Sequence, residues 1–436
     1  MIPDYQRPEA PVASAFPGIS GTSSQKAADL PWRKFFTEAR LKKLIELALA
    51  SNRDLRVATL NVEKSQAQYR VTKSSSYPTF EGGTTYNRSH ASETTADYWN
   101  ANIGSTAYEV DLFGKIRSLN QQALETYLAT TEAQRSAKLS LISEVGAQYF
   151  AIRKAEEQLE LSQQTLSAVQ GSFDSNKARL DAGESNELDF RTAEGQVQTA
   201  QANILTYERQ VAQGYNTLVL LVGHPLPSNL TSSRPLGDGN LLAKIPAGLP
   251  SDLVQSRPDI LQAEHNLIAA NANIGAARAA FFSALTLTGS AGTTSVDFSN
   301  LVKTASGTWS FSPQITVPIF NGGQNQANLD VAKISTRVEV ANYEKSIQTA
   351  FREVADALVA TNNYAKQVNN QTALIDTQQR RFSLANARYL QGEDSYLNVL
   401  SAQQDLYNAQ QGRIDAQYNT LVSRISLYKA LGGGWE

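Results

Sequence analysis

The chain has 436 residues, 41% of them hydrophobic and 18% charged, enough for a large folded body or two structural halves. It contains no cysteine, which excludes disulfides, thiol catalysis and cysteine metal sites. The formal net charge of −2 argues against a nucleic-acid partner, because such binders usually carry a basic footprint.

Proline placement gives the framework for the elements. None of the 14 prolines lies between Pro78 and Pro225, and none follows Pro318. Proline breaks a helix interior at a cost of ~3 kcal/mol or more, so long helices can run in these two gaps. Ahead of the first gap, residues 1–50 are predicted to form an N-terminal extended segment and part of an equatorial region.

Two strands are predicted within about 80–111, separated by the polar stretch 89–97, which we expect to be a loop. Tyr98 and Trp99 fall near a strand end, where aromatics of a membrane interface are expected. No stretch approaches the ~20 consecutive apolar residues of a membrane helix. A membrane protein of this composition would therefore be a β-barrel. A two-hairpin core in a soluble domain would show the same pattern.

A helical hairpin is predicted over about 115–224, with its turn at Gly183. The strict seven-residue spacing favours a coiled coil over an ordinary amphipathic helix. At ~1.5 Å per residue, a helix from about 115 to 182 would extend ~100 Å, wider than a globular core. The apolar series are Val145, Ile152, Leu159, Leu166 and Phe173 in one arm, and Phe190, Val197, Ile204, Val211 and Leu218 in the other.

The second half repeats the first. Ala178-Arg179 and Gly183 recur 209 residues later as Ala387-Arg388 and Gly392, which indicates an internal duplication. The first repeat is placed at 51–224, an equatorial linker at 225–255, and the second repeat at 256–436. The second repeat contains strands at about 284–318 with Trp309, a hairpin at about 325–430 and a C-terminal tail. Its series are Val354, Thr361, Val368, Ile375 and Phe382, then Leu400, Tyr407, Ile414, Leu421 and Tyr428.

Four strands cannot close a barrel, because the smallest bacterial barrels use about eight. Oligomerisation would supply the remaining strands, and a trimer would provide twelve. The sequence thus predicts an α+β membrane protein with four strands per chain.

The order and spacing of several motifs resemble those of the TolC family, most closely the OprM-type channels of multidrug efflux pumps. The resemblance covers essentially the whole chain. It implies a homotrimer with a twelve-stranded β-barrel, a long α-helical coiled-coil tunnel in the periplasm and a mixed equatorial domain. The motifs include Ile2-Pro3-Asp4-Tyr5-Gln6-Arg7-Pro8, Glu109-Val110-Asp111-Leu112-Phe113-Gly114, Arg257-Pro258-Asp259-Ile260 and Asn271-Ala272-Asn273.

The resemblance also implies a function. The chain would be the outer-membrane exit duct of a tripartite pump, passing drugs and other small amphipathic solutes without catalysis or a cofactor. Its partners would be a periplasmic adaptor protein, an inner-membrane transporter of the resistance-nodulation-division class and outer-membrane lipid. Relatives carry an acylated Cys just before this N-terminal motif, where Met1 stands here, so a lipid anchor would be trimmed away or absent. The alternatives are a type I protein-secretion duct and, in another class, a coiled-coil scaffold without a pore.

The candidate working parts are the two hairpin turns. No catalytic or metal-binding constellation is present, since His90, His224 and His265 are far apart in sequence. By the resemblance, Tyr389, Asp394 and Asn398 would form the periplasmic gate. The surface that docks the adaptor would comprise Arg179, Gly183, Leu188, Arg388, Gly392 and Leu397.

Overall fold

The computed structural model describes residues 1–13, 16, 29–227, 235–243, 245, 256–303 and 306–434. Much of the predicted linker, at 228–234, 244 and 246–255, lies outside these residues. The chain divides into two compact units. Unit 1 comprises Met1–Ala10, Leu60–Glu132 and Leu261–Ser346, and unit 2 comprises Pro11–Thr59, Ala133–Ile260 and Ile347–Glu436.

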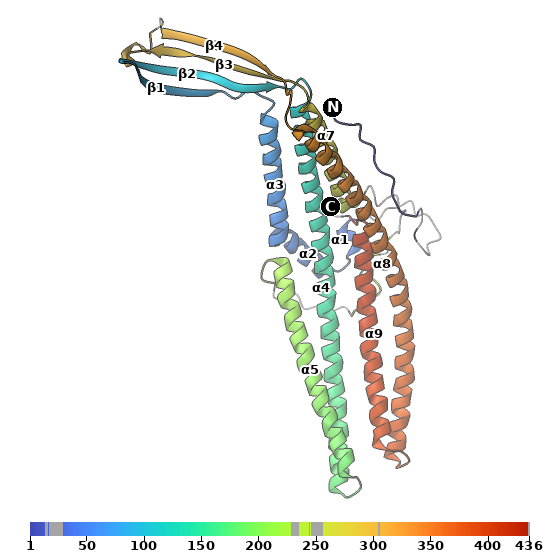
Figure 1. The fold of residues 1–436 in the computed structure, drawn as a ribbon. Coiled ribbons are helices and arrows are strands. Elements are labelled where there is room, and N and C mark those ends of the chain that lie inside the picture. The colour runs from blue at the N-terminus through green and yellow to red at the C-terminus, as the bar shows by residue number, and fades with distance from the viewer. Residues whose placement is uncertain are drawn as a thin grey trace. The chain divides into compact units, whose positions relative to one another are not determined.

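One order of elements, helix–strand–strand–helix–helix, occurs twice (Figure 1). The prediction of a mainly helical chain with four strands is confirmed, and the repeated order matches the duplication in the sequence. No helix in the described part of the chain is long and apolar enough to cross a membrane. After α1 (Trp32–Phe35) and α2 (Ala39–Ser51), the first set is α3 (Arg53–Ser74), β1 (Glu81–Ala91), β2 (Thr94–Val110), α4 (Lys115–Asp181) and α5 (Glu187–Val222). The second set is α7 (Pro258–Ala279), β3 (Ala284–Ser295), β4 (Gly307–Thr316), α8 (Gln324–Leu390) and α9 (Tyr396–Ala430), with the short 3-10 helix η2 (Phe298–Asn300) between β3 and β4.

In unit 1 the strands form one antiparallel sheet in the order β1-β2-β3-β4. Pro313 lies inside β4, opposite Leu287 of β3. The prediction that 89–97 is a loop is wrong. Only Ser92 and Glu93, both with positive φ, turn the chain between β1 and β2. The other residues of 89–97 belong to the paired strands β1 and β2, and Asp97 forms an ion pair across the strands with Arg88 at 3.5 Å.

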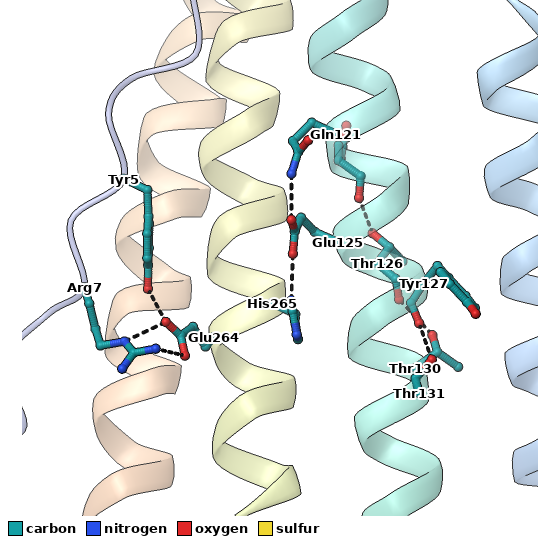
Figure 2. A network of polar contacts seen from close by, with 11 residues as sticks. Tyr5, Arg7, Gln121, Glu125, Thr126, Tyr127, Thr130, Thr131, Glu264 and His265 are labelled. Atoms are coloured by element: carbon teal, nitrogen blue, oxygen red, sulfur yellow. Dashed lines mark hydrogen bonds and ion pairs between the residues drawn. The ribbon is translucent and has the colours of Figure 1, made fainter. Parts of the chain in front are cut away.

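The N-terminal segment of unit 1 is fixed to α7 by a buried carboxylate (Figure 2). Glu264 accepts hydrogen bonds from Arg7 at 2.7 and 2.9 Å and from the Tyr5 hydroxyl at 3.1 Å. The next residue on α7, His265, contacts Glu125 of α4 at 2.6 Å. A single turn of α7 therefore contacts both the N-terminal segment and α4.

The core of unit 2 packs α1, α2, α4, α5 and α9 around large buried apolar side chains. Phe35 is fully buried and stacks on the Tyr428 ring at 4.1 Å. Buried Arg257 anchors the start of α7, donating to Asp259, to Glu353 and to the Ala430 carbonyl oxygen at 2.6–2.9 Å. Aromatic packing and a charged bond network thus hold the C-terminal end of α9 in place.

Within unit 2, α4 pairs with α5 and α8 pairs with α9 (Figure 1). Gln148 donates to the Gly214 carbonyl oxygen between the first two helices, and Arg381 pairs with Asp405 between the other two. Every residue of the four seven-residue series named above is buried or partly buried. The heptad frames predicted from the sequence therefore identify the packed faces of both hairpins.

Candidate functional site

The sheet of unit 1 has two chemically different faces. Directly opposed residues of antiparallel strands lie on the same face, so the pairing register assigns each side chain to a face. One face is mainly apolar and carries, besides Thr84, Ser105, Thr293 and Ser295, the residues Tyr86, Trp99, Ala101, Ile103, Tyr108, Val110, Leu285, Leu287, Ala291, Trp309, Phe311 and Ile315. The other is polar and carries Asn87, Asn100, Asn102, Thr286, Thr288, Ser290, Thr294, Thr308, Ser310, Ser312 and Gln314.

The apolar face is exposed to solvent in the single chain. Trp309 is 82% exposed, and Phe311, Ile315 and Ile103 are 61–69% exposed. The face has a defined border, where Tyr86 packs on Trp99 with ring centroids 4.7 Å apart and the Arg88–Asp97 pair follows. A bordered apolar surface of this kind is typical of an interaction face and unusual for a solvated one.

A bulge in β2 keeps the apolar face continuous. The pairing shifts by one residue between Ser105 and Tyr108, and Ala107 adopts a positive φ of 53°. If the pairing continued without a shift, Ala107 would lie opposite Leu287, and Tyr108 and Val110 would move to the polar face, because side chains alternate along a strand. The sequence pattern alone did not predict this bulge.

The three aromatics predicted for a membrane interface do not share one face. The register places Trp99 and Trp309 on the apolar face and Tyr98 on the polar face, opposite Asn87. Neighbouring residues of a strand point to opposite sides, so Tyr98 and Trp99 cannot both meet the same surface. Trp99 and Trp309 share the apolar face, and the membrane-interface role of the three aromatics stays a prediction.

The two hairpin turns of unit 2 have the same backbone design. Gly183 and Gly392 adopt φ values of 74° and 78°, which glycine tolerates at a helix C-terminus. In each turn the N–H one residue after the glycine donates back to an arginine carbonyl oxygen, of Arg179 or Arg388. This local requirement accounts for both glycines and for part of the similarity between the tips.

The three predicted gate residues separate into two groups. Asn398 donates to Asp394 Oδ1 at 2.5 Å, and the Ser395 N–H donates to the same oxygen at 2.8 Å. These bonds, the Asn398 one foremost, lower the pKa of Asp394, and Arg388 at 3.6 Å adds to the shift. Tyr389 instead contacts the first hairpin and is not bonded to either residue in the described contacts.

Tyr389 donates to Asn176 Oδ1 on α4 at 2.8 Å, and burial raises the pKa of the tyrosine. Asn176 was not predicted as a site residue. Its signal in the sequence is a second seven-residue series of small side chains, all buried, that runs along α4: Ala155, Ser162, Val169 and Asn176. A seven-residue series of large apolar residues does not include this face of α4.

The predicted docking residues differ in accessibility. Leu188 and Leu397 are 74% and 65% exposed, and a side chain added at Gly183 or Gly392 would meet nothing within 4 Å. By contrast, the Arg179 guanidinium lies over the Tyr389 ring at 4.9 Å, and Arg388 is paired with Asp394. The leucines and glycines thus form an open surface, while the arginines contact groups in their own chain.

Comparison with known proteins gives consistent matches over the whole chain. A family model described as "Outer membrane efflux protein" matches residues 44–224 and 249–433. The solvent efflux pump outer membrane protein SrpC of Pseudomonas putida is 48% identical, covering 100% of this chain and 95% of the relative. A membrane protein structure from Pseudomonas aeruginosa superposes with a TM-score of 0.95 at 40% identity, covering 100% and 98% of the two chains. The open-state MtrE channel of Neisseria gonorrhoeae gives 0.93 at 37% identity, covering 100% and 98%.

Proposed function

The chain belongs to the outer membrane efflux protein family, and from that premise we propose that it is the exit duct of a tripartite efflux pump. It is an outer-membrane protein of the efflux type. The single observation that carries the proposal is the sheet with one exposed apolar face and one polar face. Such a sheet would have no role in a coiled-coil scaffold without a pore, which is the alternative function from another class of protein.

The dimensions of the apolar face support a position in lipid. Trp99 and Val110 lie opposite Ser295 and Leu285 of β3, so the face extends over ten residue steps, ~33 Å at ~3.3 Å per residue. Tilted by ~40°, such a strand covers about 25 Å along the membrane normal, which matches the ~25 Å apolar band of outer-membrane barrels. The apolar face would contact acyl chains, Trp99 would lie at one interface, and the polar face would line a water-filled lumen.

Sheet topology supports three copies per duct. β1 and β4 are both edge strands, and their unpaired backbone groups could not remain unsatisfied in lipid. β1 and β4 run in opposite directions, so β4 of one copy can pair antiparallel with β1 of the next. Three copies would close twelve strands, and the helical hairpins would continue the duct into the periplasm.

Partners and substrates follow from the relatives. SrpC is named as part of a solvent efflux pump, which supports small amphipathic solutes as the substrate class here. The duct would act with a periplasmic adaptor and an inner-membrane resistance-nodulation-division transporter, the adaptor docking on exposed Leu188 and Leu397. The lipid anchor on an N-terminal Cys outside this chain stays a prediction.

Recordings in planar lipid bilayers test the duct and its gate together. Wild-type protein should form ion-conducting pores. Asp394→Ala removes one carboxylate from each of three copies, and it also removes the acceptor of Ser395 and Asn398. We expect larger conductance, weaker cation preference and less block by divalent ions, because acidic rings favour cations.

The matched control is Glu93→Ala, in the turn between β1 and β2, which should leave the block unchanged. If Asp394→Ala pores have the conductance, cation preference and divalent block of wild type, Asp394 is only a solvated turn residue. A protein that forms no pores at all would refute the duct itself.

A further inference from the structure

The turn between β3 and β4 exposes three apolar side chains within seven residues. Val296, Phe298 and Val302 are 71%, 65% and 93% exposed, although the turn that carries them is folded. Its polar groups bond to one another instead, as Asn300 Nδ2 donates to Asp297 Oδ2 at 3.3 Å. A turn that bonds its polar groups internally and exposes its apolar groups is more typical of an interaction surface than of a solvated loop.

Phe298 places this turn on the apolar side of the sheet. Its ring packs edge-on against Trp99, with ring centroids 5.0 Å apart and planes at 66°. Trp99 lies on the apolar face and packs in turn on Tyr86 of β1. The three rings, from η2, β2 and β1, form one aromatic cluster. The turn therefore lies on the side of the sheet that we assign to lipid, outside the proposed lumen.

A charged pair lies just beyond the aromatic cluster on the same face. Arg88 is two residues beyond Tyr86 on β1 and lies opposite Asp97 in the ladder, so alternation keeps the pair on the apolar side. The Arg88 side chain is 66% exposed, and among the described residues only its Nε has a partner, Asp97 at 3.5 Å. The two terminal amino groups can therefore bind a phosphate, which a guanidinium holds through paired hydrogen bonds.

The order of these groups matches the layers of one membrane leaflet. α3, α4, α7 and α8 all join the sheet at one end, so the β3–β4 turn and Arg88 lie at the opposite end. With the helical hairpins in the periplasm, that end faces the outside of the cell. From there inward come the arginine, the aromatic cluster and apolar residues such as Ile103. A leaflet presents phosphates, an interface and acyl chains in the same order.

We infer that the β3–β4 turn anchors the duct in the outer leaflet, with Phe298 and Val302 against acyl chains and Arg88 bound to a lipid phosphate. The inference rests on the proposed duct function, which places the apolar face in lipid. It adds a ligand, a phosphate-bearing lipid, and a binding surface that combines β1 with the β3–β4 turn. The turn and the apolar face share one aromatic cluster, and this continuity favours lipid over a protein partner.

Spin labels on single cysteines test the position of the turn, because the chain has no native cysteine. The protein is reconstituted into vesicles of phosphatidylcholine and phosphatidic acid. A label at Val302→Cys should be relaxed by oxygen, which concentrates in lipid, and little by a water-soluble nickel complex. The matched control is Glu93→Cys, in the turn between β1 and β2 at the same end of the sheet, where the nickel complex should dominate.

A Val302 label that is as accessible to nickel as the Glu93 label, or shielded from both probes, would overturn the anchor. A third label at Phe311→Cys, on the apolar face, separates this failure from failure of the duct. If the Phe311 label lies in lipid and the Val302 label in water, only the anchor is wrong. If both lie in water, the proposed duct is wrong as well.

Native mass spectrometry of bound phosphatidic acid tests the phosphate site. Arg88→Gln should weaken binding about ten-fold, the effect of losing one charge-assisted hydrogen bond. Asp97→Asn frees the guanidinium and should bind at least as tightly as wild type. The double variant should stay as weak as Arg88→Gln, since recovery would mean that Arg88 only neutralises Asp97. Inorganic phosphate should not displace the lipid, because it has no acyl chains, and displacement would overturn the assignment to lipid.

Discussion

Val145→Asp is expected to lower the free energy of unfolding of the helical core by about 3–5 kcal/mol, because it buries an unpaired charge. Val145 is fully buried in the core of unit 2, at the start of the first seven-residue series. Its neighbour Gly146 is so close to the Phe36 ring that an added Cβ would lie 2.9 Å from it, so the core there has no room for water. Circular dichroism of the detergent-solubilised protein should show melting many degrees below wild type.

The control is Gln163→Asp on the same helix, at a position that is exposed in the chain. Both substitutions place aspartate inside α4, so the cost of its low helix propensity is similar in the two variants. The control should change stability by no more than about 0.5 kcal/mol. Leu159→Asp, at a partly buried seam position, should fall between the two. Equal melting of the Val145 and Gln163 variants would mean that the heptad frame does not define the packed face.

Phe311→Lys is expected to destabilise the membrane-inserted protein by ~2–4 kcal/mol, the cost of a lysine facing lipid near the middle of an outer-membrane barrel. Phe311 is 61% exposed on the apolar face and pairs with Gly289 of β3. The measurement is urea-induced unfolding of protein refolded into lipid vesicles, where the midpoint should fall relative to wild type.

Ser312→Lys is the matched control, because the next residue of β4 lies on the polar face. A lysine there would meet the water-filled lumen, so the unfolding midpoint should stay near that of wild type. Loss of stability in the Ser312 variant with none in the Phe311 variant would reverse the assignment of the two faces.

The long helices could be predicted from the sequence because their signals are local and repeated. Proline-free gaps allow α4 and α8 to run for 67 residues each, and the seven-residue series set the faces that pack. The turn at each tip could also be predicted, since Gly183 and Gly392 meet a local backbone requirement that only a few residue types satisfy.

The features that the sequence alone does not predict depend on partners distant in sequence. The polar residues 89–97 form strand because cross-strand pairing, as of His90 with Thr95, overrides their low strand propensity. The face of Tyr98 follows from a register that only the pairing fixes. The bond between Asn176 and Tyr389 forms only because folding brings together residues 213 positions apart.

The proposed duct requires three copies, because four strands per chain cannot close a barrel, and native mass spectrometry of the detergent-solubilised protein tests this requirement most directly. We predict a single species at three times the chain mass of 47.5 kDa. A stable monomer or dimer that still inserts into membranes would contradict it, because its two strand edges would remain unpaired in lipid.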